Sequence, residues 1–257
     1  MNNIIYMTSP NIETIHAFTT RIGGVSSGSY GSLNLAQKTG DDIEKVRENY
    51  DLLCNALGIS TDDIVCSHQV HGTNIRVVTG DDRGGLYKPN PHQADGLITK
   101  TPGVALLVYT ADCVPVLLYD PVTNAAGAVH AGWRSTMADI AGIAIKKMVS
   151  EFSCSPVNIK AAIGPCISKC CFETDKDVAD ALYYVLNADA ESCIIKHGDK
   201  YKIDLKETNR LLLKRAGVND IDVSEDCTSC LTDKYWSHRK IKGARGTQAA
   251  LIAVRDS

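Results

Sequence analysis

Three short segments hold the residues of this chain that are best suited to chemistry. They are residues 67–72, which contain His68 and His71, residues 110–113, which end in Cys113, and residues 129–134, which contain His130. Each segment adjoins an apolar run typical of a buried strand. The chain therefore places imidazoles and a thiol at the ends of several predicted strands.

One thiolate and two imidazoles are enough to hold one metal ion. Three protein ligands of this type leave a fourth position for water or substrate, which is the arrangement of a catalytic rather than a structural zinc site. Thiolate and imidazole also suit copper, so the donor types alone do not separate the two metals. Without a metal, Cys113 as nucleophile and His130 as base would form a cysteine–histidine dyad.

Strand geometry selects among the candidate ligands. We expect residues 67–71 to form a strand that ends in a turn at residues 72–74, so His68 and His71 would point to opposite faces. His71, beside Gly72, is better placed to project from the strand end. Pro115 supports a break at Cys113 between two buried strands, and the same alternation turns Asp112 away from Cys113.

Several further polar residues lie where binding loops would be expected. Arg134 opens a predicted helix just after His130, where a guanidinium favours a phosphate or a carboxylate. Arg21, Asn34, His238 and Arg239 lie in short polar runs with the composition of binding loops on a rigid scaffold.

The cysteines other than Cys113 need a separate explanation. The chain has ten cysteines. Because its first residues do not resemble an export signal, we expect these cysteines to be in a reducing compartment. Cys227 and Cys230 have C-x-x-C spacing without a second such pair, and Cys166, Cys170 and Cys171 lie close together in sequence. We interpret them as buried thiols near the active site, with a structural site of four thiolates as the less favoured alternative.

Composition limits the class of protein. At 257 residues the chain fits one large α/β domain, and its net charge of -3 gives no electrostatic reason to expect nucleic acid as a partner. The apolar runs are too short to cross a bilayer. We expect a cytoplasmic protein that binds neither membrane nor nucleic acid.

The pattern of apolar residues predicts a mixed α/β architecture. Helices are predicted at residues 41–58, 135–149, 176–186 and 205–216, and strands at 75–78, 97–99, 104–109, 114–119, 125–130, 159–163, 193–196 and 250–254. The strands cluster between isolated helices, which favours a mixed-sheet α/β sandwich over a dinucleotide-binding fold. The strands at 104–109 and 114–119 are apolar on both faces, as expected of central strands covered on both sides.

A longer set of motifs resembles a known family. Residues 18–26, 32–35, 40–42, 68–72, 94–96, 110–115, 129–134, 164–167 and 237–239 occur in the order found in the purine nucleoside phosphorylase family formerly called multicopper polyphenol oxidoreductases, or laccase-like proteins. The likeness covers nearly the whole chain. It implies a single α/β domain over residues 1–257 that shares its fold with the catalytic domain of cytotoxic necrotizing factor toxins.

The resemblance also implies a site and an activity. It implies a metal, usually zinc, on His71, Cys113 and His130, phosphorolysis of adenosine, inosine and methylthioadenosine, and deamination of adenosine. On this basis Arg21, Arg134 and Arg239 are candidates to hold phosphate, Asn34 and His238 to bind substrate, and Asp112 to carry a proton. The expected partners are purine nucleosides and phosphate, and the expected state is a monomer or weak homodimer. Ser135 departs from the glycine that the family often has there.

Three other functions remain open from the residues. A metal-free cysteine hydrolase or deamidase would use the Cys113–His130 dyad and would not need His71. Copper-dependent phenol oxidation would follow the older family name, although one three-ligand site is fewer than the several copper centres that oxygen reduction employs. A metal-storage role would need a closed coordination shell.

Overall fold

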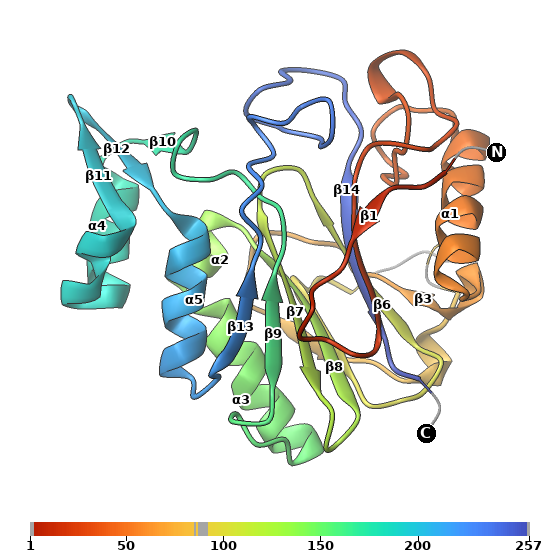
Figure 1. Cartoon of the computed structure of the whole chain (residues 1–257), viewed down its shortest axis with the longest axis horizontal. Coiled ribbons are helices and arrows are strands. Elements are labelled where there is room, and N and C mark those ends of the chain that lie inside the picture. Colours follow the sequence, from red (N-terminus) through yellow and green to blue (C-terminus); the bar gives the residue numbers. More distant parts are fainter. Residues whose placement is uncertain (1–2, 85, 87–91, 256–257) are drawn as a thin grey trace.

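The computed structural model describes residues 3–84, 86 and 92–255, and two β-sheets pack face to face at its centre (Figure 1). The five-stranded sheet has the order β1 (Tyr6–Met7), β2 (Ile15–Thr19), β14 (Gln248–Ala253), β6 (Ala105–Thr110) and β3 (Ile64–Val65). The six-stranded sheet has the order β13 (Asp220–Val223), β9 (Lys160–Ile163), β7 (Val114–Asp120), β8 (Ala125–Ala131), β5 (Gly96–Thr99) and β4 (Ile75–Val77). Both sheets mix parallel and antiparallel pairs, so the predicted mixed-sheet α/β fold is confirmed.

The central strands are buried on both faces. On β6, Leu106 packs between the two sheets, whereas Leu107 packs on the outer side of its sheet. On β7, Leu117 faces the space between the sheets and Leu118 faces outward. This alternation explains why the sequences of β6 and β7 are apolar at almost every position, as predicted for central strands.

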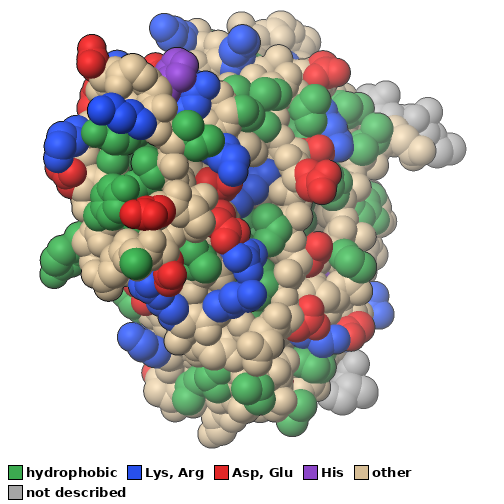
Figure 2. All heavy atoms as spheres, turned by 60° about the vertical axis from the view of Figure 1, so that its left-hand side comes forward, with side chains coloured by type: hydrophobic (Ala, Val, Ile, Leu, Met, Phe, Trp, Pro, Cys, Tyr) green, Lys and Arg blue, Asp and Glu red, His purple; other side chains and the backbone are tan. Residues whose placement is uncertain are grey.

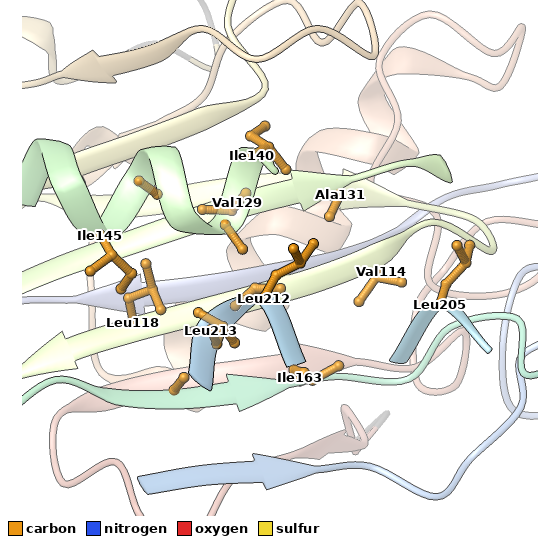
Figure 3. Close-up of a cluster of buried hydrophobic side chains, with 14 of the residues drawn as sticks. Val114, Leu118, Val129, Ala131, Ile140, Ile145, Ile163, Leu205, Leu212 and Leu213 are labelled. Atoms are coloured by element: carbon orange, nitrogen blue, oxygen red, sulfur yellow. The ribbon is translucent and has the colours of Figure 1, made fainter. Parts of the chain in front are cut away.

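Helices cover the outer faces of both sheets. Helix α1 (Ile43–Leu57) buries Val46, Tyr50 and Leu53 against the five-stranded sheet. The six-stranded sheet is covered by α3 (Ile140–Phe152) and α5 (Leu205–Arg215), whose apolar side chains meet those of β7, β8 and β9 (Figure 3). The result is a helix–sheet–sheet–helix arrangement that buries apolar residues at three interfaces.

A smaller unit projects beside α5. It contains α4 (Lys176–Leu186) and a three-stranded antiparallel sheet of order β10 (Glu173–Thr174), β12 (Lys200–Ile203) and β11 (Ile194–His197). Figure 2 shows acidic and basic side chains interspersed on the face that carries this unit. The mixture agrees with the small net charge of the chain. Among the described residues, no helix is both long and apolar enough to cross a membrane.

The predicted helices are confirmed with one exception. Asp42 caps the start of α1 by accepting a hydrogen bond from the Glu44 amide, and Gly58 ends it with a φ of 69°. The single helix predicted at residues 135–149 is wrong, because the chain forms α2 (Trp133–Met137) and then α3. Between them Asp139 has a φ of 56°, and its side chain accepts a hydrogen bond from the Gly142 amide as the cap of α3.

The eight strands predicted from apolar runs at residues 75–78 to 250–254 are all present, with ends shifted by no more than two residues. The strands that the sequence does not predict are β1, β2, β3, β10, β12 and β13, and all of them except β2 are short or polar. For example, β12 reads Lys-Tyr-Lys-Ile and β13 reads Asp-Ile-Asp-Val. Such short or charged segments carry little of the apolar alternation by which a strand is recognised.

Candidate functional site

The three polar segments meet where the chain crosses from one sheet to the other. Residues 111–113 connect β6 of the five-stranded sheet to β7 of the six-stranded sheet, and residues 66–74 connect β3 to β4 in the same way. Pairing of β8 with β7 places His130 opposite Pro115, two residues beyond Cys113. The topology therefore brings His71, Cys113 and His130 together at one end of the strands of the sandwich.

The three side chains form a compact donor set. The Cys113 sulfur lies 3.7 Å from Nε2 of His71, and the rings of His71 and His130 are 4.8 Å apart with an interplanar angle of 79°. One donor atom of each residue lies within 4.8 Å of the others. Tetrahedral zinc, with Zn–S of about 2.3 Å and Zn–N of about 2.0 Å, needs its sulfur and nitrogen about 3.5 Å apart. The donors therefore fit one zinc or copper ion.

A buried aspartate holds two of these donors in place. The Asp95 carboxylate accepts hydrogen bonds from the backbone N–H groups of Val70, His71 and Gly72, at 3.1, 2.9 and 2.7 Å. The same carboxylate lies 2.8 Å from Nδ1 of His130. With Nδ1 bonded to Asp95, the other ring nitrogen of His130 is left as its donor atom for the centre.

The electrostatics of the centre favour an ionised thiol. Burial opposes ionisation of Cys113, but hydrogen bonds and charge from His130 and His71 outweigh it and lower the Cys113 pKa to about 6. Burial also opposes protonation of His130, yet Asp95 and Cys113 raise the His130 pKa to about 9. The thiolate is the form of cysteine that binds a metal or acts as a nucleophile.

His71 reaches the centre from a loop and not from a strand. The strand predicted at residues 67–71 is wrong, since the segment contains only an isolated bridge between His68 and Gln93. His71 has a φ of 59°, a left-handed conformation that costs energy for a residue with a side chain. The three backbone hydrogen bonds to Asp95 stabilise this turn and direct His71, not His68, toward Cys113.

The absence of a side chain at Gly132 leaves space for the side chains of His71 and Cys113. A Cβ at Gly132 would lie 2.7 Å from Cδ2 of His71 and 3.4 Å from the Cys113 sulfur. The first distance is shorter than a van der Waals contact permits, so a side chain at this position would displace the His71 ring.

The donor set borders a cavity of about 490 Å³. Its wall includes Asp112, Arg134, His238 and Arg239, which the sequence indicates, together with residues it does not, namely Gln69, Tyr109, Trp133, Ile167, Phe172, Leu205, Arg245 and Thr247. Among these, Nε of Arg245 is buried and has no hydrogen-bond partner in the described part of the chain. A buried guanidinium N–H without a partner is costly, which makes Arg245 a candidate ligand contact.

Two predicted binding residues do not reach the cavity wall. The Arg21 guanidinium donates hydrogen bonds to the carbonyl oxygens of Gly31 and Thr232, and it stacks 3.8 Å from the centre of the Trp236 ring. Asn34 is fully buried, and its amide nitrogen donates to the Asp41 carboxylate. Both residues hold neighbouring loops in place, because their polar atoms form hydrogen bonds with other parts of the chain.

Asp112 lies at the cavity but is held by several hydrogen bonds. Its carboxylate accepts from Oγ1 of Thr228 at 2.6 Å, from Oγ of Ser237 at 3.0 Å and from the backbone N–H of Arg239 at 2.6 Å. The Asp112 backbone has a φ of 94°. This geometry makes Asp112 an anchor for the segment that carries His238 and Arg239.

Asp95 and Arg245 are the main residues that sequence reasoning leaves without a role. Asp95 stands between Ala94 and Gly96 directly before a strand, and a carboxylate among small residues at a strand end is a signal for a buried acceptor. Arg245 lies in a Lys-Gly-Ala-Arg-Gly run that reads as an exposed basic loop. Only the folded chain shows that its side chain lines the cavity.

Together, the fold and the site define a mixed α/β protein with a His–Cys–His donor centre at the wall of a substrate-sized cavity. The family model described as "Multi-copper polyphenol oxidoreductase laccase" matches residues 15–255. The chain therefore belongs to this laccase-like polyphenol oxidoreductase family, as its motifs indicate.

Close relatives carry a different functional name. The chain is 37% identical over 253 residues, 96% of its length and 92% of the relative's, to "Purine nucleoside phosphorylase YlmD" of Geobacillus stearothermophilus. It is 36% identical over 253 residues, 98% of its length and 99% of the relative's, to "Purine nucleoside phosphorylase YfiH" of Escherichia coli. The crystal structure of the hypothetical protein YfiH of Bacillus licheniformis matches with a TM-score of 0.93 and 32% identity, covering 99% of this chain and 97% of that one.

The hydrogen bonds of Asp95 lead to a first prediction. Asp95→Asn removes the negative charge and one acceptor oxygen, so the turn at residues 70–72 and the ring of His130 lose their common anchor. We expect zinc affinity, measured by competition with a chromogenic chelator, to fall about ten- to a hundredfold. Asp199→Asn, at an exposed position in the β11–β12 turn, is the control and should change nothing. Unchanged affinity in Asp95→Asn would contradict the positioning role.

The close approach at Gly132 leads to a second prediction. Gly132→Ala should displace the His71 ring and weaken zinc binding at least tenfold, while the circular dichroism spectrum stays that of the folded protein. Gly80→Ala is the matched control, because nothing lies within 4 Å of a Cβ at that position and its backbone is not left-handed. Equal affinity in the two variants would show that the centre tolerates a side chain at residue 132.

Proposed function

We propose that this protein is a metal-dependent purine nucleoside phosphorylase that also deaminates adenosine. The proposed substrates are adenosine, inosine and S-methyl-5′-thioadenosine, cleaved with phosphate to the free base and the ribose 1-phosphate or its methylthio analogue. The observation that carries the proposal is the union in one cavity of the His71–Cys113–His130 centre with three arginines, Arg134, Arg239 and Arg245. The names of the relatives from Geobacillus and Escherichia support the same activity.

The arginines provide a fixed surface for an anion. The guanidinium of Arg134 lies 4.3 Å from the centre of the Trp133 ring, and that of Arg239 lies 5.4 Å from the Phe172 ring. Nη1 of Arg239 also donates to the Glu173 carbonyl at 2.9 Å. Planar guanidinium groups match the oxygens of phosphate, and groups already held in place lose less entropy on binding.

The size and lining of the cavity suit a nucleoside. A volume of about 490 Å³ lies within the range of about 300–1,000 Å³ typical of small-molecule pockets. The rings of Trp133 and Phe172 supply apolar surface on which a purine can stack. His238 adds a polar group able to bond to the base or the ribose.

In the proposed phosphorolysis, a phosphate oxygen bonds to the anomeric carbon of ribose while the bond from that carbon to the purine nitrogen breaks. The attacking hydrogen phosphate loses one proton and the departing purine gains one, so charge and atoms balance. Arg134, Arg239 and Arg245 hold the phosphate in position for this attack. In the proposed deamination, water adds to the purine carbon that bears the amine, and ammonia leaves.

His71, Cys113 and His130 would hold the metal on which both activities depend. A zinc ion bound there supplies Lewis acidity, and copper fits the same donors. Asp95 keeps the His130 ring oriented, and the low pKa of Cys113 keeps its sulfur ionised near neutral pH.

A second candidate function rests on the spatial arrangement of three residues. In space, His130 lies between Asp95 and Cys113, with 2.8 Å between Asp95 and His130. This is the arrangement of orienting carboxylate, base and nucleophile in a cysteine hydrolase. A metal-free amide hydrolase of this kind would need Cys113 and His130 but not His71.

Product analysis with and without phosphate tests the proposed function. With adenosine and phosphate we expect adenine and ribose 1-phosphate, and without phosphate we expect inosine and ammonia.

His71→Ala should lose the bound metal and at least a hundredfold of both activities, because one of three ligands is removed. His197→Ala, at an exposed position on β11, is the control and should keep both.

Two outcomes would contradict the proposal. Amide hydrolysis that survives chelators and His71→Ala but is lost in Cys113→Ala would establish the dyad instead. Oxidation of a phenol much faster than phosphorolysis of inosine would establish the older oxidase description.

The assignment of Arg245 gives a separate prediction. Arg245→Gln should raise the KM for phosphate about ten- to a hundredfold, because it removes a charge-assisted hydrogen bond. The KM for the nucleoside should change less. Lys242→Gln, an exposed cation of the same loop, is the control. A raised nucleoside KM with an unchanged phosphate KM would assign Arg245 to the sugar or base instead.

A further inference from the structure

Four cysteines that the proposed function does not use lie together beside the cavity. Cys170 and Cys171 follow β9, and Cys227 and Cys230 follow β13. A parallel bridge between Cys166 and Cys227 joins the two segments. The C-x-x-C pair therefore has a partner that spacing alone does not reveal, namely a vicinal pair from a segment 57 residues away in sequence.

The sulfur atoms are spaced as around a single ion. The distances are 3.7 Å for Cys170–Cys171, 3.6 Å for Cys170–Cys230 and 3.3 Å for Cys171–Cys230, and all four sulfurs lie within 4.8 Å of one another. Tetrahedral zinc with Zn–S of about 2.3 Å sets its sulfurs about 3.8 Å apart. A disulfide needs about 2.05 Å and joins two sulfurs rather than four.

The surroundings of the sulfurs do not fit inert core thiols. Cys170 and Cys230 are exposed and Cys171 is partly so, so the interpretation of these three as buried thiols is wrong. The sulfur of buried Cys227 also accepts a hydrogen bond from the backbone N–H of Ser168 at 3.3 Å. Backbone N–H groups that point at sulfur stabilise a thiolate and orient it as a ligand.

We propose that Cys170, Cys171, Cys227 and Cys230 bind a second zinc ion in a closed, structural site. Four thiolates fill the tetrahedral shell, so this site has no open position for substrate. The inference stands apart from the proposed function, because none of the four cysteines belongs to the His71–Cys113–His130 centre.

The site joins two walls of the cavity. Ile167 and Phe172, on either side of the first cysteine pair, line the cavity, and Arg239 donates a hydrogen bond from Nη1 to the Cys171 carbonyl at 3.3 Å. Thr228, inside the second pair, donates to Asp112. An ion held by both pairs would fix the walls that carry Phe172 and Arg239, and so position these residues without touching substrate.

Elemental analysis of full-length variants purified without oxygen tests the proposal. We expect two zinc ions per chain in the wild type and one in Cys230→Ser. The double variant His71→Ala/Cys113→Ser should retain one, and the triple variant that adds Cys230→Ser should retain none. Cys154→Ala, which removes a buried cysteine outside both sites, should keep two. Zinc content that is unchanged by Cys230→Ser would overturn the proposal, as would iron in place of zinc.

This design separates the two metal sites. If the wild type holds one zinc ion that Cys230→Ser removes, the cysteine site is supported and the metal-dependent form of the proposed function fails. If it holds one that only His71→Ala/Cys113→Ser removes, the reverse is true.

A measurement on a protein with all four cysteines guards against misfolding of the serine variant. Co²⁺ added to the His71→Ala/Cys113→Ser protein, after its zinc has been removed with a chelator, should give the intense charge-transfer absorption of a tetrathiolate centre, with one equivalent at saturation. Thiol titration of the unfolded wild type in the presence of a chelator should find all ten cysteines reduced. Eight thiols, or no thiolate absorption with Co²⁺, would show a disulfide or unligated sulfurs instead.

Discussion

The candidate centre depends on the buried carboxylate of Asp95. Its two oxygens serve three backbone N–H groups of one loop and the ring of His130, which come from different segments of the chain. A fully buried charge is stable only when its hydrogen bonds are satisfied. The requirement to satisfy Asp95 therefore stabilises the left-handed turn at His71 and the orientation of His130 together.

Sheet topology supplies the rest of the geometry. The loop of His71 and the loop of Cys113 both connect the five-stranded sheet to the six-stranded sheet. They do so at the same end of the strands, because β3 and β6 are parallel. The apolar faces of β6 and β7 pack tightly and fix the distance between the sheets, so these crossings have little freedom. Gly132 then leaves room for the two side chains to meet. The sandwich core thus sets the spacing of three donors that are distant in sequence.

The sequence predicts this fold well where the local pattern is strong. The burial of β6 and β7 on both faces and the helix at residues 41–58 follow from local patterns, and both predictions are confirmed. The predictions fail where long-range contacts decide the outcome. Arg21 has the residue type of a phosphate ligand, but its guanidinium is bonded to the Gly31 and Thr232 carbonyls and stacked on Trp236. Arg245 has the sequence context of a surface charge, but it lines the cavity. A motif gives residue types, but only the fold shows which partners those residues already have.

Asp112 couples the two cysteine-containing centres. It precedes Cys113 in the crossing between the sheets, and its carboxylate binds Thr228, which lies between Cys227 and Cys230, and the backbone of Arg239. Movement of the second cysteine pair would therefore reach the cavity wall through Asp112 and Arg239. It would not reach His71 and His130 by the same route, since Asp95 holds the backbone of His71 and the ring of His130. Loss of order at the four cysteines should thus disturb Arg239 and the neighbouring Cys113 before it disturbs the rings of His71 and His130.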